Sequence, residues 1–324
     1  MARQRTAAQN VTSFADRFDA VVDNVAQVIS GKEDAIRLSL VCMMAEGHLL
    51  IEDVPGVGKT SLAKTLAASI DGEYSRIQFT PDLLPSDVTG VMVYKRNNDK
   101  FEFRQGGIFA NIVLGDEINR ASPKTQSALL EAMEERQVTI DSTTYLLAAP
   151  FMVIATQNPI EHEGTYPLPE SQLDRFLMRI EMGYPDRASE IEILDHHHVA
   201  KGTDDVKAVV SSDDVQEMAA LATTVHVAPS LKGYLVDLAD ATRRHPRLAL
   251  GVSPRGTLSL LRATRALAAS VGREFVLPDD LKALAGPVLE HRLVLTPEAS
   301  MSGATQADIL EDVLGSVPVP TAKG

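Results

Sequence analysis

Short apolar runs alternate with segments of helical spacing from residue 48 to residue 183. Most of these runs have no regular polar positions, so the strands they form would be covered by helices on both faces. Such strands separated by helices are typical of an α/β fold with a mainly parallel sheet. The five runs that we predict to be its strands are residues 48–53, 74–80, 110–117, 151–157 and 176–183.

The segments between these runs carry helical signals. Residues 59–70 and 122–137 have apolar positions at helical spacing. Ser122 and Pro123 suit the N-cap and the first helical position of the second segment, because serine accepts from unpaired N–H groups and proline needs no partner there. Residues 1–45 add a helical segment that we expect to pack on the α/β domain.

Two insertions interrupt the α/β pattern. Residues 91–105 and 137–150 each alternate apolar and polar positions on both sides of a turn-forming segment, which predicts two β-hairpins. Hairpins added to a sheet core are candidates for moving parts or for contacts with a partner.

The C-terminal part has helical patterns without strands. The four predicted helices are residues 211–223, 230–245, 253–270 and 277–292, with Ser, Asp or Pro at their starts. We therefore expect three regions: a helical segment and α/β core over residues 1–185, an all-α domain over 186–314, and a flexible tail over 315–324.

Composition narrows the function classes. The chain has 31 Lys and Arg against 44 Asp and Glu, a formal net charge of -13, which opposes non-specific binding to nucleic acid or to anionic membranes. The single cysteine, Cys42, allows no internal disulfide and no cysteine metal cluster. No apolar run is long enough for a membrane span, and no apolar stretch of a secretory signal follows the first residues, so we expect a cytoplasmic protein.

The segment "EDVPGVGKTS" lies between the first predicted strand and the first predicted helix, which is the setting of a phosphate-binding loop. The usual pattern GxxxxGK[ST] requires glycine at position 53, where this chain has Asp53. Because Asp53 stands before the tight part of the turn, we expect a working loop. Whether its carboxylate slightly weakens nucleotide affinity is a separate question, which Asp53→Gly would answer. The loop residues expected around the phosphates are Pro55, Gly56, Val57, Gly58, Lys59, Thr60 and Ser61.

Lys59 can reach the β and γ phosphates, and Thr60 offers a hydroxyl to Mg²⁺. Asp116 and Glu117 end the third predicted strand, at the sheet edge where open α/β sheets bind ligands. There Asp116 would hold Mg²⁺ and Glu117 would activate the attacking water as a general base. Asn158 follows the fourth strand, where its amide can position that water; a turn-forming Asn-Pro pair is the alternative interpretation.

Four longer stretches resemble the MoxR family of AAA+ ATPases. They are residues 79–90, 101–139, 158–180 and 253–268, and the likeness extends over about residues 25–300. In that family an acidic residue is tolerated at the first position of the phosphate loop. The resemblance implies a ring-forming ATPase, commonly a hexamer, that remodels client proteins as a chaperone, often with a partner that carries a von Willebrand factor A domain.

The resemblance also implies roles for single residues. Lys59 and Thr60 match the Walker A motif, Asp116 and Glu117 match Walker B, and Asn158 matches sensor 1. It further implies an adenine-contacting segment, with Val28, Ile29 and Gly31 as its wall.

Two arginines complete the matched positions. Arg175 resembles the arginine finger that is offered to a neighbouring subunit, although Arg179 and Arg120 are rival candidates on spacing alone. Arg255 resembles sensor 2, and a cation in the first turn of a helix is unfavourable unless an anion offsets it. We expect Arg255 to report the γ-phosphate to the helical domain while Lys59 reports it to the core.

The predicted activity is hydrolysis of ATP to ADP and phosphate with Mg²⁺. Three alternatives stay open: a binding module gated by the nucleotide, a subunit related to metal chelatases, and a DNA-acting motor. The net charge and the few basic residues in the hairpins argue against the motor and against nucleic acid as a partner.

Overall fold

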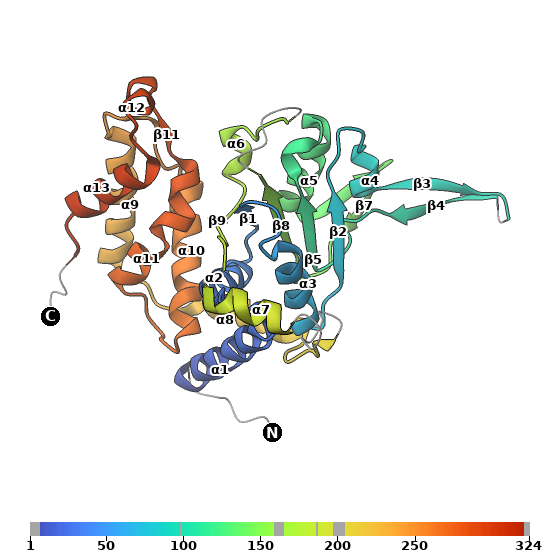
Figure 1. Cartoon of the computed structure of the whole chain (residues 1–324), viewed down its shortest axis with the longest axis horizontal. Coiled ribbons are helices and arrows are strands. Elements are labelled where there is room, and N and C mark those ends of the chain that lie inside the picture. Colours follow the sequence, from blue (N-terminus) through green and yellow to red (C-terminus); the bar gives the residue numbers. More distant parts are fainter. Residues whose placement is uncertain (1–6, 98, 159–164, 186, 197–204, 321–324) are drawn as a thin grey trace.

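Five parallel strands form one sheet at the centre of the part of the chain that the structure describes, residues 7–97, 99–158, 165–185, 187–196 and 205–320 (Figure 1). The structure is a computed structural model. Across the sheet the strands follow the order β2 (Tyr74–Gln78), β5 (Ile112–Asp116), β8 (Met152–Gln157), β1 (Leu49–Glu52) and β9 (Met178–Ile180). Every pairing is parallel, which confirms the predicted strands and their direction.

Helices cover both faces of the sheet, because successive side chains of a strand point to opposite faces. Leu49 and Ile51 are buried in the apolar cluster of one face, and Leu50 is buried in the cluster of the other. The helices are α1 (Ala7–Ala26), α2 (Glu33–Met44) and α3 (Lys59–Ser69) on the first face and α5 (Pro123–Glu135) on the second. Ser122 caps α5 by accepting from the N–H of Thr125, as predicted.

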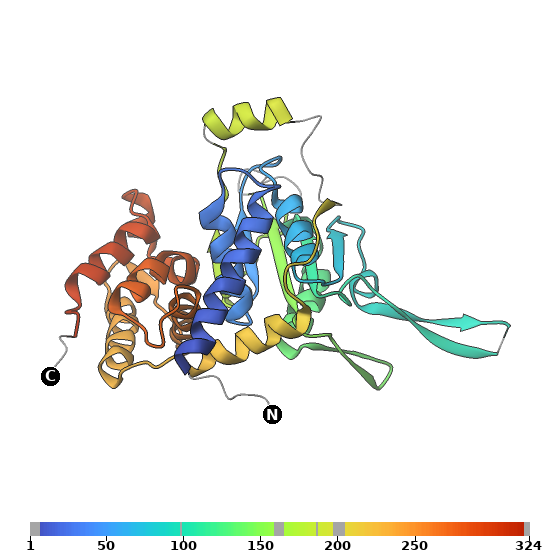
Figure 2. The same cartoon turned by 90° about the horizontal axis from the view of Figure 1, so that it is seen from below.

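Both predicted hairpins are present. They are β3 (Gly90–Lys95) with β4 (Lys100–Gln105), and β6 (Gln137–Ile140) with β7 (Thr143–Leu146). The short helix α4 (Pro85–Thr89) leads into the first of them. Figures 1 and 2 show the first hairpin extending away from the sheet, and Figure 2 shows the second extending toward the same side.

The C-terminal region is helical. Its helices in the described part are α8 (Ser212–Thr224), α9 (Pro229–Arg244), α10 (Pro254–Ser270), α11 (Pro278–Leu289), α12 (Pro297–Met301) and α13 (Gln306–Ser316). A short antiparallel pair, β10 (Leu248–Leu250) with β11 (Val294–Leu295), joins them and was not predicted. In the described ranges we find no helix that is long and apolar enough to cross a membrane.

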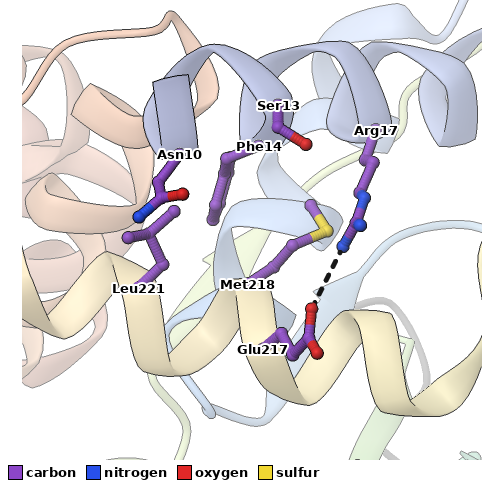
Figure 3. A pocket seen from close by; sticks show the side chains of 7 residues that line it. All are labelled: Asn10, Ser13, Phe14, Arg17, Glu217, Met218 and Leu221. Carbon is purple, nitrogen blue, oxygen red and sulfur yellow. Dashed lines mark ion pairs between the residues drawn. The ribbon is translucent and has the colours of Figure 1, made fainter. Parts of the chain in front are cut away.

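The N-terminal helix α1 lies alongside α8 (Figure 2). Arg17 of α1 pairs with Asp214 at 3.0 Å and with Glu217 at 3.5 Å, while Phe14 and Met218 are buried nearby. Figure 3 shows Phe14, Arg17, Glu217 and Met218 among the side chains that line a cavity, whose volume is about 220 Å³. Since the ion pairs neutralise the charges of its lining, we interpret this cavity as a packing feature of the α1–α8 contact.

Candidate active site

The loop between β1 and α3 has the backbone of an anion-binding site. Gly56 and Gly58 have φ angles of 88° and 95°, values that glycine adopts without a steric penalty. Gly58 is the N-cap of α3, so the loop leads directly into the first unpaired N–H groups of that helix. Such a helix N-terminus attracts phosphate through its N–H groups and its dipole.

A cavity of about 420 Å³ joins this loop to the carboxyl ends of three strands. Its lining consists of Pro55, Gly56, Gly58, Lys59, Thr60, Ser61, Arg76, Gln78, Asp116, Glu117, Thr156 and Asn158. The structure therefore brings together the predicted loop residues, the two carboxylates and the amide of Asn158. Val57 is the exception among the loop residues, because its side chain is buried in the apolar core.

Lys59 is held beside the loop. Its Nζ donates to the backbone oxygen of Asp53 at 2.7 Å. Burial lowers the pKa of Lys59, and the carboxylates of Asp53, Asp116 and Glu117 oppose that shift. The ammonium thus lies on the acidic side of the cavity, where it can balance the charge of bound phosphates.

Thr156 connects the two acidic residues of β5. Its hydroxyl donates to Asp116 Oδ1 at 2.7 Å and accepts from the backbone N–H of Glu117 at 2.9 Å. Glu117 has a φ of 57°, in the left-handed region that a residue with a long side chain rarely occupies. Backbone strain of this kind concentrates at functional sites, and here it turns the Glu117 side chain toward the cavity.

Three residues hold the carboxylates in place from the side. Arg76 pairs with Asp116 Oδ2 at 2.6 Å, and both Gln78 Nε2 and Arg120 Nη1 donate to Glu117 Oε2 at 2.9 Å. Arg120, a rival candidate for the finger, is therefore engaged by its own chain's Glu117. Arg76 and Gln78 were missed in the sequence; they share a face of β2, the strand next to β5, so knowledge of the strand order is the signal that finds them.

The residue at the missing glycine position has a structural task. Asp53 is 9% exposed, and its carboxylate accepts from the backbone N–H groups of Val54 at 2.7 Å, Met182 at 2.8 Å and Gly183 at 2.5 Å. Lys32 Nζ donates to the backbone oxygen of Met182 at 2.7 Å. The carboxylate thus ties the start of the loop to the segment after β9. Its effect on nucleotide affinity stays a question for experiment.

Replacing Asp53 with glycine, which restores the usual loop pattern, is expected to destabilise the protein. Hydrogen bonds to a charged group contribute about 1.5 to 3 kcal/mol each, so we expect the free energy of unfolding to fall by about 2 to 4 kcal/mol. We also expect a higher dissociation constant for ATP, because the loop loses its anchor. Denaturant unfolding and nucleotide titration test both, with Asp53→Asn as an intermediate. Unchanged stability together with tighter binding would show that the carboxylate acts on the phosphates instead.

The predicted adenine wall is part of the segment between α1 and α2. Val28 and Ile29 pack into the same apolar cluster as Val57 and Met182. Gly31 has a φ of 72°, and a Cβ there would lie 2.3 Å from Ser189 Oγ of α7 (Arg187–His196). These residues do not line the phosphate cavity, and their contact with adenine stays a prediction.

Arg175 and Arg255 lie at the other end of the strands, beside their amino ends. Arg175 precedes β9, and its Nη1 donates to the backbone oxygen of Leu130 at 2.8 Å and pairs with Glu134 at 3.2 Å. Arg255 pairs with the same Glu134, and both arginines line a second cavity of about 170 Å³. His48, the residue before β1, lines this cavity too.

Parallel strands separate the two cavities. The phosphate loop follows β1 and the second cavity precedes it, so four residues of strand lie between them, about 13 Å at roughly 3.3 Å per residue. In Figure 1, α6 (Glu170–Leu173), which precedes β9, and α7, which follows it, lie at opposite ends of the strands. The expectation that Arg255 contacts the nucleotide of its own chain is therefore corrected, because α10 begins beside the amino ends of the strands.

Comparison with known proteins identifies the family. Residues 48–178 match the ATPase family associated with various cellular activities (AAA), and residues 240–313 match an AAA lid domain. The chain is 39% identical to Chaperone MoxR1 of Mycobacterium tuberculosis over 97% of its length and 85% of that protein, and 32% identical to Protein MoxR of Paracoccus denitrificans over 97% and 99%. The chain belongs to the MoxR family of AAA+ ATPases.

Two further proteins are similar over nearly the whole chain. Protein YeaC of Bacillus subtilis, which is uncharacterised, is 48% identical over 93% of this chain and 94% of its own. The crystal structure of a putative ATPase from Cytophaga hutchinsonii has a TM-score of 0.91 at 40% identity and covers 97% of this chain and 98% of its own. The segment that matches the AAA ATPase family includes Lys59, Glu117, Asn158 and Arg175, and the segment that matches the lid domain includes Arg255.

Proposed function

We propose that this MoxR-family ATPase hydrolyses ATP with Mg²⁺ in an oligomeric ring and uses the energy to remodel client protein complexes. The observation that carries the proposal is the cavity that joins the phosphate loop to Glu117 and Asn158. A loop that binds phosphate, a carboxylate that can accept a proton and an amide that can orient water are the parts that hydrolysis requires.

The residues present fit a nucleotide with its metal ion. The Thr60 hydroxyl and the Asp116 carboxylate lie in the same cavity and are oxygen ligands of the kind that Mg²⁺ prefers. Arg76 already pairs with Asp116, so this position accepts a cation as the partner of the carboxylate. A bound Mg²⁺ would neutralise phosphate charge, while Glu117 accepts the proton of the attacking water and Asn158 orients that water.

Arg175 and Arg255 are proposed to act on a neighbour's nucleotide. Both lie beside the amino ends of the strands, whereas the phosphate loop lies at the carboxyl ends, so neither lines the phosphate cavity of its own chain. A head-to-tail contact would place the amino ends of the strands of one subunit against the phosphate loop of the next. Repeating this contact gives a ring when the rotation between neighbours closes. This arrangement supports a ring of subunits, and we propose that the ring has six members. Arg179 fits the role less well, since it lies within β9 and does not line the second cavity; it pairs there with Glu52 at 3.1 Å and with Glu290 at 3.6 Å.

The chaperone function rests on relatives. The name of Chaperone MoxR1 supports remodelling of client proteins. The family resemblance supports a partner with a von Willebrand factor A domain, and we propose that the protein acts in the cytoplasm. Within the described residues, we find no contact that favours the metal-chelatase or the DNA-acting alternative.

A nucleotide-gated binding module is the second candidate. The contacts of Gln78 and Arg120 with Glu117 favour it, because a base held by two donors is less free to accept a proton. In that case ATP would order a surface for a partner, and turnover would be incidental.

Turnover measured against protein concentration tests the proposal. If the site is completed by a neighbour, we expect the rate per subunit to rise as the ring assembles, in parallel with the mass measured by light scattering. A removal of Mg²⁺ by a chelator should abolish this rate. Absence of turnover in the assembled protein, with ATP still bound, would favour the gated binding module.

A further inference from the structure

Arg292 is a charged residue buried far from the phosphate cavity. It ends the short helix η3 (Glu290–Arg292) and is only 4% exposed. Its Nε donates to Asp174 Oδ1 at 2.8 Å, and its Nη2 donates to the backbone oxygen of Phe176 at 2.6 Å. Nη1 donates to the backbone oxygen of Leu177 at 3.3 Å and also contacts that of Val288. One guanidinium thus joins the end of α11 to the segment just before β9.

The same network includes the start of α10. The second carboxylate oxygen of Asp174 accepts a hydrogen bond from Ser253 Oγ at 3.1 Å. Ser253 Oγ in turn caps α10 by accepting from the N–H of Gly256 at 3.1 Å. A Cβ at Gly256 would lie 2.8 Å from Arg292 Cδ. The glycine of the segment "SPRG" is therefore needed for the close approach of the Arg292 side chain.

This network lies directly beside the two arginines of the second cavity. Arg175 follows Asp174 in the chain, and Arg255 comes two residues after Ser253. Both also pair with one carboxylate, that of Glu134. The positions of the two guanidinium groups relative to each other are thus fixed from both sides.

Burial of this ion pair gives little net stability. Removing two charges from water costs several kcal/mol per ion, and apolar side chains of similar size often stabilise a protein as well or better. A guanidinium with several fixed donors, however, defines the geometry of all the groups that it joins. The contacts of Arg292 therefore fit a task in positioning better than one in stabilisation.

We propose that Arg292 is a positioning residue that, through Asp174, holds Arg175 and Arg255 as one unit directed at the nucleotide of a neighbouring subunit. This inference rests on the proposed function, in which both arginines act between subunits. Because the lid supplies Arg292 and Arg255 while the core supplies Asp174 and Arg175, the same contacts also hold the lid in place against the core. Loss of Arg292 then impairs the neighbour's site and leaves the chain's own phosphate cavity intact.

The test uses Arg292→Lys, which keeps the charge and the pairing with Asp174 but removes the fork of donors. We expect assembly and ATP affinity as in the wild-type protein and a turnover of the assembled protein that is lower by about 10- to 100-fold. Arg273→Lys is the matched control, since Arg273 forms a two-pronged pair with Asp280 elsewhere in the lid, at 2.9 and 2.5 Å. Its turnover should be unchanged. If Arg292→Lys does not fold, Asp174→Asn, which keeps the side-chain shape, replaces it in the same assays.

Mixed rings separate positioning between subunits from an effect on the chain's own site. Arg292→Lys has an intact phosphate cavity, and Glu117→Gln has intact arginines, so roughly one interface in four of an equal random mixture should be complete. We expect turnover to reappear in this mixture, to the extent seen when Arg175→Ala is mixed in the same way. Wild-type turnover of Arg292→Lys alone, or recovery with Arg175→Ala but not with Arg292→Lys, would overturn the inference. A wild-type protein without turnover that depends on assembly would instead overturn the proposed function on which it rests.

Discussion

Replacing Glu117 with glutamine is expected to reduce ATP turnover by about 10² to 10⁴-fold, the usual contribution of a general base. The amide has the size of the carboxylate but cannot accept the proton of the attacking water. Gln78 and Arg120 can still donate to its carbonyl oxygen, so the side chain should keep its place. Because the phosphate loop is unchanged, ATP should bind with the wild-type affinity and remain bound. Single-turnover measurements with labelled ATP separate binding from hydrolysis.

Glu311→Gln is the matched control for this substitution. Glu311 is exposed on α13, away from both cavities, and the same chemical change there should leave turnover unchanged. If Glu117→Gln hydrolyses ATP at the wild-type rate, Glu117 does not activate the water. The gated binding module would then become the better account of the cavity.

The fold could be predicted because its signals are local. Most strands of the sheet are buried on both faces and appear in the sequence as apolar runs, and the hairpins have alternating positions around a turn. The outer strand β2 is the exception, because its Arg76 and Gln78 are exposed. The pair β10–β11 could not be predicted in this way. Its strands have three and two residues, too few for any period to be detected.

The candidate site could be predicted in part for the same reason. Lys59, Asp116 and Asn158 stand in or directly after motifs that follow strands, and parallel strands bring such positions to one edge. The contact between Gln78 and Glu117 depends on β2 lying beside β5, which periodicity alone does not reveal. The role of Asp53 depends on a segment 129 residues away.

The place of Arg255 depends on a still longer-range property, the packing of the lid against the core. Its position in the first turn of α10 was predictable, and so was the need for an anion near it. Glu134, at the end of α5, is that anion in this structure. Tertiary contacts, such as those of Arg292 with Asp174 and Phe176, decide whether α10 approaches the amino or the carboxyl ends of the strands. No local sequence pattern encodes these contacts.

Replacing Arg175 with alanine is expected to give the largest loss of turnover that leaves a chain's own phosphate cavity untouched. An arginine supplied by a neighbour contributes about 10³ to 10⁵-fold to the rate of phosphoryl transfer, and the turnover of the assembled protein should fall to that extent. The ion pair with Glu134 is partly exposed, so its loss should cost less than about 1 kcal/mol of stability. Glu134 keeps Arg255 as a partner, and ATP affinity should be unchanged.

Arg247→Ala is the control, because Arg247 pairs with Asp312 at 2.5 Å on the surface of the lid, outside both cavities. Its turnover should equal that of the wild type.

The same assays with Arg179→Ala and Arg120→Ala identify the arginine finger among the three candidates. Only a variant that lacks the finger should regain turnover when it is mixed with Glu117→Gln. Arg120 contacts Glu117 within one chain, so a defect of Arg120→Ala should persist in that mixture. If Arg175→Ala keeps wild-type turnover in assembled rings, the second cavity does not face a nucleotide, and the contact between subunits must use another edge of the sheet.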